Sequence, residues 1–96
     1  MIVAAARVQI RLPENQSLKG KRQVVKSVLA RVRREFGVAA AEVDAQDRWQ
    51  IAVLGFACVS SSEHHARKIL DNLLDYVEES RLDVEVLEVE VELLGM

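Results

Sequence analysis

The first twelve residues alternate between apolar and polar side chains. Apolar residues occupy every second position along residues 1–12, while Arg7, Gln9 and Arg11 point to the other side. A period of two residues is typical of a strand with one buried face. Pro13 keeps the residue before it, Leu12, extended, and we predict a connecting loop at residues 14–16 after the strand.

The next segment changes to the period of a helix. Ser17 is a favourable N-cap, because its hydroxyl can accept a hydrogen bond from a free backbone N–H of the first turn. Gly37 is the residue type expected just after a helix end. We therefore predict a helix from Leu18 to about Phe36. At about 100° per residue, one side of this helix collects the apolar residues Leu18, Val25, Val28, Leu29, Val32 and Phe36.

Three more strands and a second helix are predicted in the rest of the chain. Ser60 and Glu63 form a capping box that marks the start of the second helix. In the last strand the alternation slips near Val86 and Leu87, which indicates a β-bulge. The three predicted strands span residues 38–43, 49–59 and 82–94.

The element order βαββαβ predicts a single domain over residues 1–96. Two split βαβ units in this order form a ferredoxin-like α+β sandwich, in which a four-stranded antiparallel sheet carries two helices on one face. In that topology the last strand lies beside the first. Arg7 and Arg11 should then lie beside the glutamates of residues 88–92 on the uncovered face.

Basic residues are concentrated in the first predicted helix. The whole chain has a formal net charge of −2, yet residues 17–36 hold seven basic residues and one acid, a charge of +6. Residues 71–96 hold one basic residue and nine acids, a charge of −8. Solvated helices usually mix the two signs, and cations near a helix N-terminus oppose the helix dipole. The helix is therefore predicted to bind phosphates, as in RNA. An ordinary solvated face is the alternative.

Four of these basic side chains fall within about 60° of one another, along one flank of the apolar stripe. This cationic flank consists of Lys19, Arg22, Lys26 and Arg33. Arg31 and Arg34 lie further round, towards solvent. The complete predicted phosphate-binding set is Lys19, Lys21, Arg22, Lys26, Arg31, Arg33 and Arg34.

The start of this helix resembles a known family. Residues 17–22 read SLKGKR and are similar to the SLKEKR-type motif of the YlxP-like proteins, a small bacterial family of unknown function. The stretches RLPENQSLK, AEV at residues 41–43 and DRWQ at residues 47–50 support the resemblance, which covers nearly the whole chain. It implies a ferredoxin-like fold, no established activity and, by association with ribosome-maturation factors, RNA. The sequence departs at Gly20, where the family usually has Glu, so a Ser-x-x-Glu capping box is missing.

The third predicted strand suggests an apolar patch on the open face of the sheet. If its glycine faces the helices, then Leu54 and Phe56 lie on the uncovered face. Val3 and Ala5 of the first strand would join them there. An exposed apolar patch marks an interaction surface, so these four residues are predicted to form a homodimer interface.

The sequence offers little for catalysis or metal binding. His64 and His65 are adjacent on a helix and point about 100° apart, so they cannot chelate one ion together without other ligands. Cys58 is expected to be a small packing residue. The acids of the last strand are not paired for acid–base chemistry, and the loop before the first helix lacks the glycines of an acylphosphatase phosphate loop. We predict no catalytic residue, no metal and no cofactor.

These features predict a non-enzymatic cytoplasmic protein that binds RNA or the ribosome and forms a homodimer. A single cysteine fits a reducing compartment, and no apolar stretch approaches the roughly 18 residues of a membrane span. The alternative is a dimeric protein-interaction or regulatory module whose basic helix docks an acidic protein partner. An enzyme is the third option. Trp49 is either a core residue or the lip of a binding site.

Overall fold

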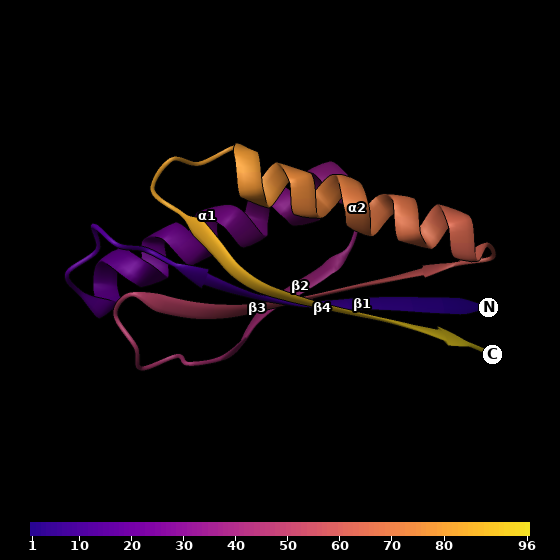
Figure 1. The fold of residues 1–96 in the computed structure, drawn as a ribbon, viewed down its shortest axis with the longest axis horizontal. Coiled ribbons are helices and arrows are strands. Elements are labelled where there is room, and N and C mark those ends of the chain that lie inside the picture. Colours follow the sequence, from indigo (N-terminus) through magenta and orange to yellow (C-terminus); the bar gives the residue numbers. More distant parts are fainter.

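The computed structural model describes residues 1–96 and contains four strands and two helices in the predicted order (Figure 1). The strands are β1 (Ile2–Arg11), β2 (Ala39–Asp44), β3 (Ile51–Ser60) and β4 (Glu85–Gly95). The helices are α1 (Leu18–Phe36) and α2 (Glu63–Glu79). Neither helix is both long enough and apolar enough to cross a membrane.

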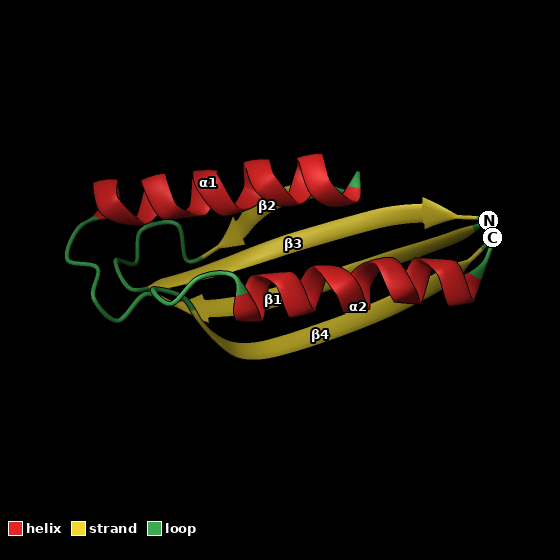
Figure 2. Ribbon diagram, turned by 90° about the horizontal axis from the view of Figure 1, so that it is seen from above, coloured by secondary structure: helices red, strands yellow, loops and turns green.

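The four strands form one antiparallel sheet in the order β2-β3-β1-β4. Both helices lie on the same face of this sheet (Figure 1). Seen from above, α1 runs along the β2 side and α2 runs over β1 and β4 (Figure 2). The two chain ends lie side by side, because the Met1 ammonium donates to the Met96 carbonyl at 2.5 Å. This arrangement confirms the predicted ferredoxin-like fold.

The ends of α1 follow the predicted capping pattern, whereas the start of α2 does not. Ser17 Oγ accepts a hydrogen bond from the Gly20 N–H at 3.0 Å, and Gly37 ends α1 in the left-handed conformation with φ 63°. The N-cap of α2 is Ser62, whose Oγ accepts from the His65 N–H at 3.3 Å. The predicted capping box at Ser60 is wrong, because β3 continues through that residue.

The predicted bulge in the last strand is confirmed. Gln9 lies opposite Glu88 while Ile10 lies opposite Val86, so Leu87 is the extra residue of β4. If the register continued without the bulge, Ile10 would lie opposite Leu87 and Arg11 would lie opposite the apolar Val86. The bulge instead puts Glu85 opposite Arg11, and the two form an ion pair at 3.2 Å.

The cross-strand charges of the open face follow the prediction in part. Arg7 lies opposite Glu90, and the closest charged atoms of the pair are 3.9 Å apart. Arg7 also reaches across β3 to the edge strand β2, where it forms an ion pair with Asp44 at 3.0 Å. The partner of Arg11, by contrast, lies outside residues 88–92, at Glu85.

The predicted orientation of β3 is wrong. Leu54 and Phe56 are 0% and 2% exposed and belong to the hydrophobic core between the sheet and the helices. Their cross-strand partners in β1 are Val8 and Ala6, which face the helices as well. Leu54 and Phe56 are therefore not at a dimer interface.

Gly55 explains the other face of β3. It lies on the open face, where the Val43 side chain crosses it. A Cβ at Gly55 would come within 2.8 Å of Val43 Cγ1, far below ordinary contact distance. The glycine thus makes room for a neighbouring strand's side chain and not for a helix.

Candidate nucleic-acid interface

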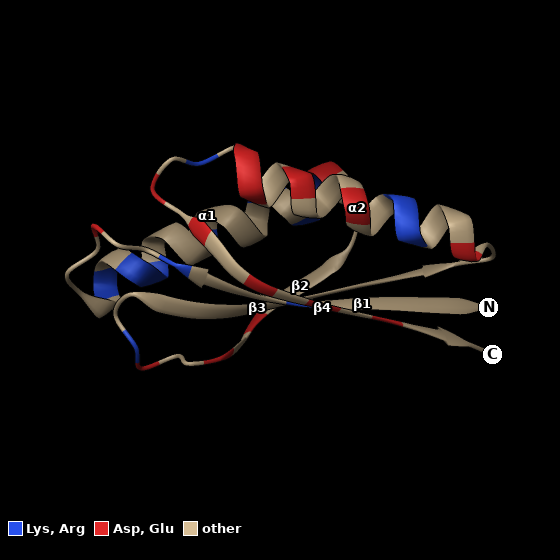
Figure 3. Cartoon of the chain, viewed as in Figure 1, with Lys and Arg blue, Asp and Glu red and all other residues tan.

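The basic side chains of α1 lie in very different surroundings. Figure 3 shows basic residues along the first half of α1 and acidic residues on the second half of α2 and on β4. The first turn of α1 holds no acid. The predicted phosphate-binding residues therefore have to be placed one by one.

Lys21 is the clearest correction. Its side chain is completely buried, and its Nζ donates to the carbonyls of Ala45 at 2.7 Å, Gln46 at 3.1 Å and Ile51 at 3.1 Å. Nζ also lies 3.0 Å from a carboxylate oxygen of Glu42 on β2. A side chain with no exposed surface cannot contact phosphate, so the prediction for Lys21 is wrong. Its position one turn before the buried Val25 was the signal in the sequence.

The lysine cannot satisfy all four oxygens equally. An ammonium group has three N–H donors, and in this structure the three carbonyls receive them. Oε2 of Glu42 is buried and has no hydrogen bond, although it lies against the positive charge. The ion pair therefore neutralises charge inside the protein, while the hydrogen bonds hold the backbone between β2 and β3.

Arg33 and Arg31 contact the protein itself while remaining exposed. Arg33 Nη2 donates to the carbonyl of Ala40, which places the cationic flank on the side of the edge strand β2. Arg31 Nε lies 3.5 Å from the carboxylate of Glu35, and its guanidinium lies 5.9 Å from the centre of the Tyr76 ring. Both residues keep part of their surface in solvent.

The other four predicted residues are exposed and take part in no ion pair. These free cations are Lys19, Arg22, Lys26 and Arg34. The helical period brings the first three together on the cationic flank with Arg33, whereas Arg34 lies further round the helix. The structure thus keeps a smaller cationic surface than the sequence predicted.

The loop before α1 is joined to the loop between β2 and β3. Asn15 Nδ2 donates to the carbonyl of Ser17 at 2.7 Å and to that of Trp49 at 2.5 Å. A Cβ at Gly20 would collide with the Asn15 side-chain oxygen. Gly20 therefore leaves room for this amide.

Trp49 is not a core residue. It precedes β3, and the residue is 57% exposed. Of the two roles considered from the sequence, only a place at the surface is compatible with this exposure. A cavity of about 560 Å³ beside it is lined by Trp49, Arg11, Arg48, Gln50 and Ile51.

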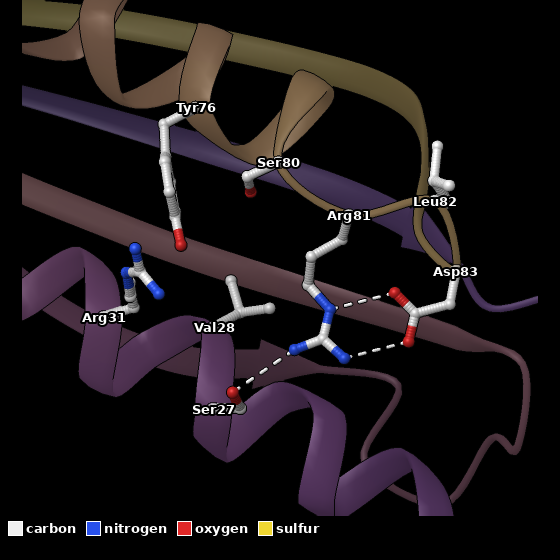
Figure 4. Close-up of a pocket in the computed structure, with 8 residues that line it drawn as sticks. All are labelled: Ser27, Val28, Arg31, Tyr76, Ser80, Arg81, Leu82 and Asp83. Carbon is white, nitrogen blue, oxygen red and sulfur yellow. Dashed lines mark hydrogen bonds and ion pairs between the residues drawn. The ribbon is translucent and has the colours of Figure 1, made fainter.

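A second cavity, of about 530 Å³, opens between the two helices and the α2–β4 loop (Figure 4). Arg81 and Asp83 form two parallel hydrogen bonds of 2.9 Å at its edge, and Arg81 Nη1 also donates to Ser27 Oγ at 3.2 Å. The hydrogen bonds to Asp83 raise the pKa of Arg81, and the same bonds lower the pKa of Asp83. Both groups stay charged near neutral pH, so the pair fixes the loop and supplies no proton.

The remaining candidates for chemistry lie apart from one another. His64 and His65 are exposed in the first turn of α2. No three His, Cys, Asp or Glu side chains are grouped to hold a metal ion. Cys58 is 8% exposed, and desolvation by burial raises the pKa of its thiol, which disfavours the reactive thiolate.

Comparison with known proteins supports the family resemblance. The uncharacterized protein YlxP of Bacillus subtilis (strain 168) is 42% identical over 62 residues, which are 65% of this chain and 67% of that protein. The de novo designed protein Foldit4 is similar in fold, with a TM-score of 0.56 over 100% of this chain and 99% of its own. Its sequence identity of 14% carries no functional information.

A family model described as protein of unknown function (DUF503) matches residues 3–91. This match covers the whole fold from β1 into β4, including both helices and the loops that hold Trp49. The chain therefore belongs to the YlxP-like family of proteins of unknown function (DUF503).

Proposed function

We propose that this protein is a non-enzymatic cytoplasmic protein that binds RNA, or a ribonucleoprotein such as the ribosome, through phosphate contacts of α1. The observation that carries the proposal is the set of free cations, Lys19, Arg22, Lys26 and Arg34, which are exposed and outside every ion pair. Exposed cations that lack acidic neighbours are suited to phosphate contacts, whereas paired ones are already compensated.

The position of these cations supports the same reading. Lys19 and Arg22 lie in the first turns of α1, where the helix dipole disfavours positive charge by some tenths of a kcal/mol per residue. No acid in that turn offsets the cost. A bound phosphate would offset it, because the helix N-terminus and the cations attract the same anion. The acids of α2 and β4 lie elsewhere on the molecule (Figure 3), so a net negative chain still presents a local basic surface.

The salt dependence of RNA affinity tests this proposal. Three phosphate contacts by Lys19, Arg22 and Lys26 predict a slope of about −2 for log affinity against log salt on single-stranded RNA. Changing these three residues to Gln keeps helix propensity nearly constant and removes no buried contact. We expect the variant to stay folded, to lose affinity for RNA and to show a flatter slope in fluorescence anisotropy titrations.

A comparison on the other helix controls for the loss of positive charge, with two cations removed instead of three. Arg67 and Lys68 are exposed on α2, and changing both to Gln should leave affinity and slope close to those of the wild type. A folded α1 variant that binds RNA as the wild type does would show that the free cations are only a solvated face.

A second candidate function, a dimeric protein-interaction module, is favoured by one observation on the open sheet face. Val3 lies between its cross-strand partners Val59 and Leu94, which are 66% and 60% exposed. With the exposed Ala5 these residues form an open-face patch. A two-fold interface pairs one patch with its own copy. A dimer of this kind would leave α1 free for an acidic protein partner.

Light scattering tests the dimer with a variant of Val59, which lies on the open face, whereas Leu54 and Phe56 are buried. Val59→Glu places a charge in the open-face patch without touching the core, so we expect a wild-type dimer and a monomeric variant. Leu82→Glu changes a fully exposed leucine on the α2–β4 loop and should remain dimeric. A wild type that is monomeric at high micromolar concentration would remove this candidate.

A further inference from the structure

The loop between β2 and β3 is held in place by two features that each cost folding free energy. Ala45 lies in the left-handed backbone conformation with φ 57°, which costs a residue with a side chain some stability. Two of the three carbonyls that Lys21 binds belong to Ala45 and Gln46. Burial of a lysine is itself unfavourable unless its charge and donors are satisfied. The protein thus uses a strained residue and a buried charge to fix the first half of this loop.

The second half of the loop is fixed to the loop before α1. Gln50 Nε2 donates to the carbonyls of Pro13 at 3.3 Å and Asn15 at 3.1 Å. In return, the Leu12 N–H donates to the Gln50 carbonyl at 2.8 Å. In both ribbon views the two loops lie at the same end of the molecule, where α1 begins (Figures 1 and 2).

This framework presents one large side chain to solvent. Trp49 is the only tryptophan of the chain, and the residue is 57% exposed although a hydrogen bond holds its backbone carbonyl. The amide of Asn15 that binds this carbonyl also binds Ser17, the N-cap of α1. The Trp49 backbone therefore lies next to the start of α1, whose first two turns carry Lys19 and Arg22.

Two arginines beside Trp49 carry the positive charge that suits contacts with a nucleic-acid backbone. Arg48 is exposed, and Arg11 is 48% exposed although it pairs with Glu85. Both line the cavity of about 560 Å³ beside the indole. An aromatic face next to cations is how proteins bind single-stranded nucleic acids, because any base can stack on the ring while the cations contact the backbone.

We propose that Trp49 is a base-stacking residue for single-stranded RNA, at the end of the phosphate-binding surface of α1. This proposal rests on the proposed function and adds to it a substrate class, unpaired bases. The buried Lys21 is then a positioning residue, since it holds the loop that carries the indole without touching the ligand. A protein partner at Trp49 is the competing outcome.

Tryptophan fluorescence tests the stacking directly, because the single indole is the only such reporter. We expect a single-stranded oligoribonucleotide to quench the emission of the wild type. Inorganic polyphosphate and polyglutamate carry negative charge without bases, so they should cause little quenching. Trp49→Ala should weaken RNA affinity about tenfold to a hundredfold, as expected for the loss of one stacked base. Trp49→Phe should restore most of the affinity, and Leu82→Ala, at another exposed apolar side chain, should change nothing.

The outcomes separate this inference from the proposed function. RNA binding that depends on Lys19, Arg22 and Lys26 but neither quenches Trp49 nor weakens in Trp49→Ala would overturn the stacking role alone. Quenching by polyglutamate as strong as that by RNA would overturn it in favour of an acidic protein. A wild type that binds no RNA would overturn both the stacking role and the proposed function.

Discussion

Replacing Lys21 with methionine is expected to destabilise the fold by about 3–5 kcal/mol, the usual effect of removing one partner of a buried ion pair. The variant leaves the Glu42 carboxylate without its counter-charge and three carbonyls without donors. A domain of this kind has a total stability of about 5–15 kcal/mol. Urea unfolding followed by circular dichroism should therefore show a large decrease in the midpoint.

Two further variants make the Lys21 result specific. Lys26→Met changes an exposed lysine on the same helix, and should alter stability by no more than about 0.5 kcal/mol. Adding Glu42→Leu to Lys21→Met removes both charges and should recover part of the loss. A Lys21→Met protein as stable as the wild type would show that the buried ammonium holds nothing in place.

Replacing Phe56 with glutamate should prevent folding. Phe56 is 2% exposed within the core, where loss of the ring alone costs about 3–5 kcal/mol. The new carboxylate would also be buried without a partner, which adds to the cost. Together these terms are comparable with the whole stability of a small domain, so far-ultraviolet circular dichroism should show a largely unfolded chain.

The matched control lies on the same strand. Val59 is 66% exposed, and Val59→Glu should leave the circular dichroism spectrum and the unfolding midpoint nearly unchanged. A folded Phe56→Glu protein together with an unfolded Val59→Glu protein would mean that β3 is turned the other way.

The contrast between the buried Phe56 and the exposed Val59 is a property that the sequence alone does not predict. Residues 51–59 of β3 are apolar or small at every position, so no alternation tells the buried face from the open one. The faces are decided by the register with β1, which pairs Phe56 with Ala6 and Leu54 with Val8. That register is a long-range property. By contrast, β1 and α1 have clear periods, and the apolar residues of their buried faces were predicted correctly, although Lys21 on the buried face of α1 was not.

The candidate site was predicted less completely than the fold. Charge counting found the basic helix, and four of its cations are indeed exposed and unpaired. Charge counting could not tell the buried Lys21 from the exposed cations. The carbonyls that bind Lys21 come from residues 45–51, more than 20 positions away in the sequence. Its place on the apolar stripe of α1 indicated burial, but a lysine is rarely buried without such partners. The sequence likewise did not decide between a core residue and the lip of a binding site for Trp49, since its exposure depends on contacts between two loops.

Nuclear magnetic resonance titration of the labelled protein with a single-stranded oligoribonucleotide tests the central claim most directly, since it locates the RNA on the structure. Our account predicts that amide signals of residues 17–26 at the start of α1 and of residues 47–50 before β3 shift with increasing RNA. Raising the salt concentration should reverse these shifts. The signals of α2 and of the strand β4 should stay in place. RNA-dependent shifts confined to the open-face patch or to the cavity between the helices would contradict the account.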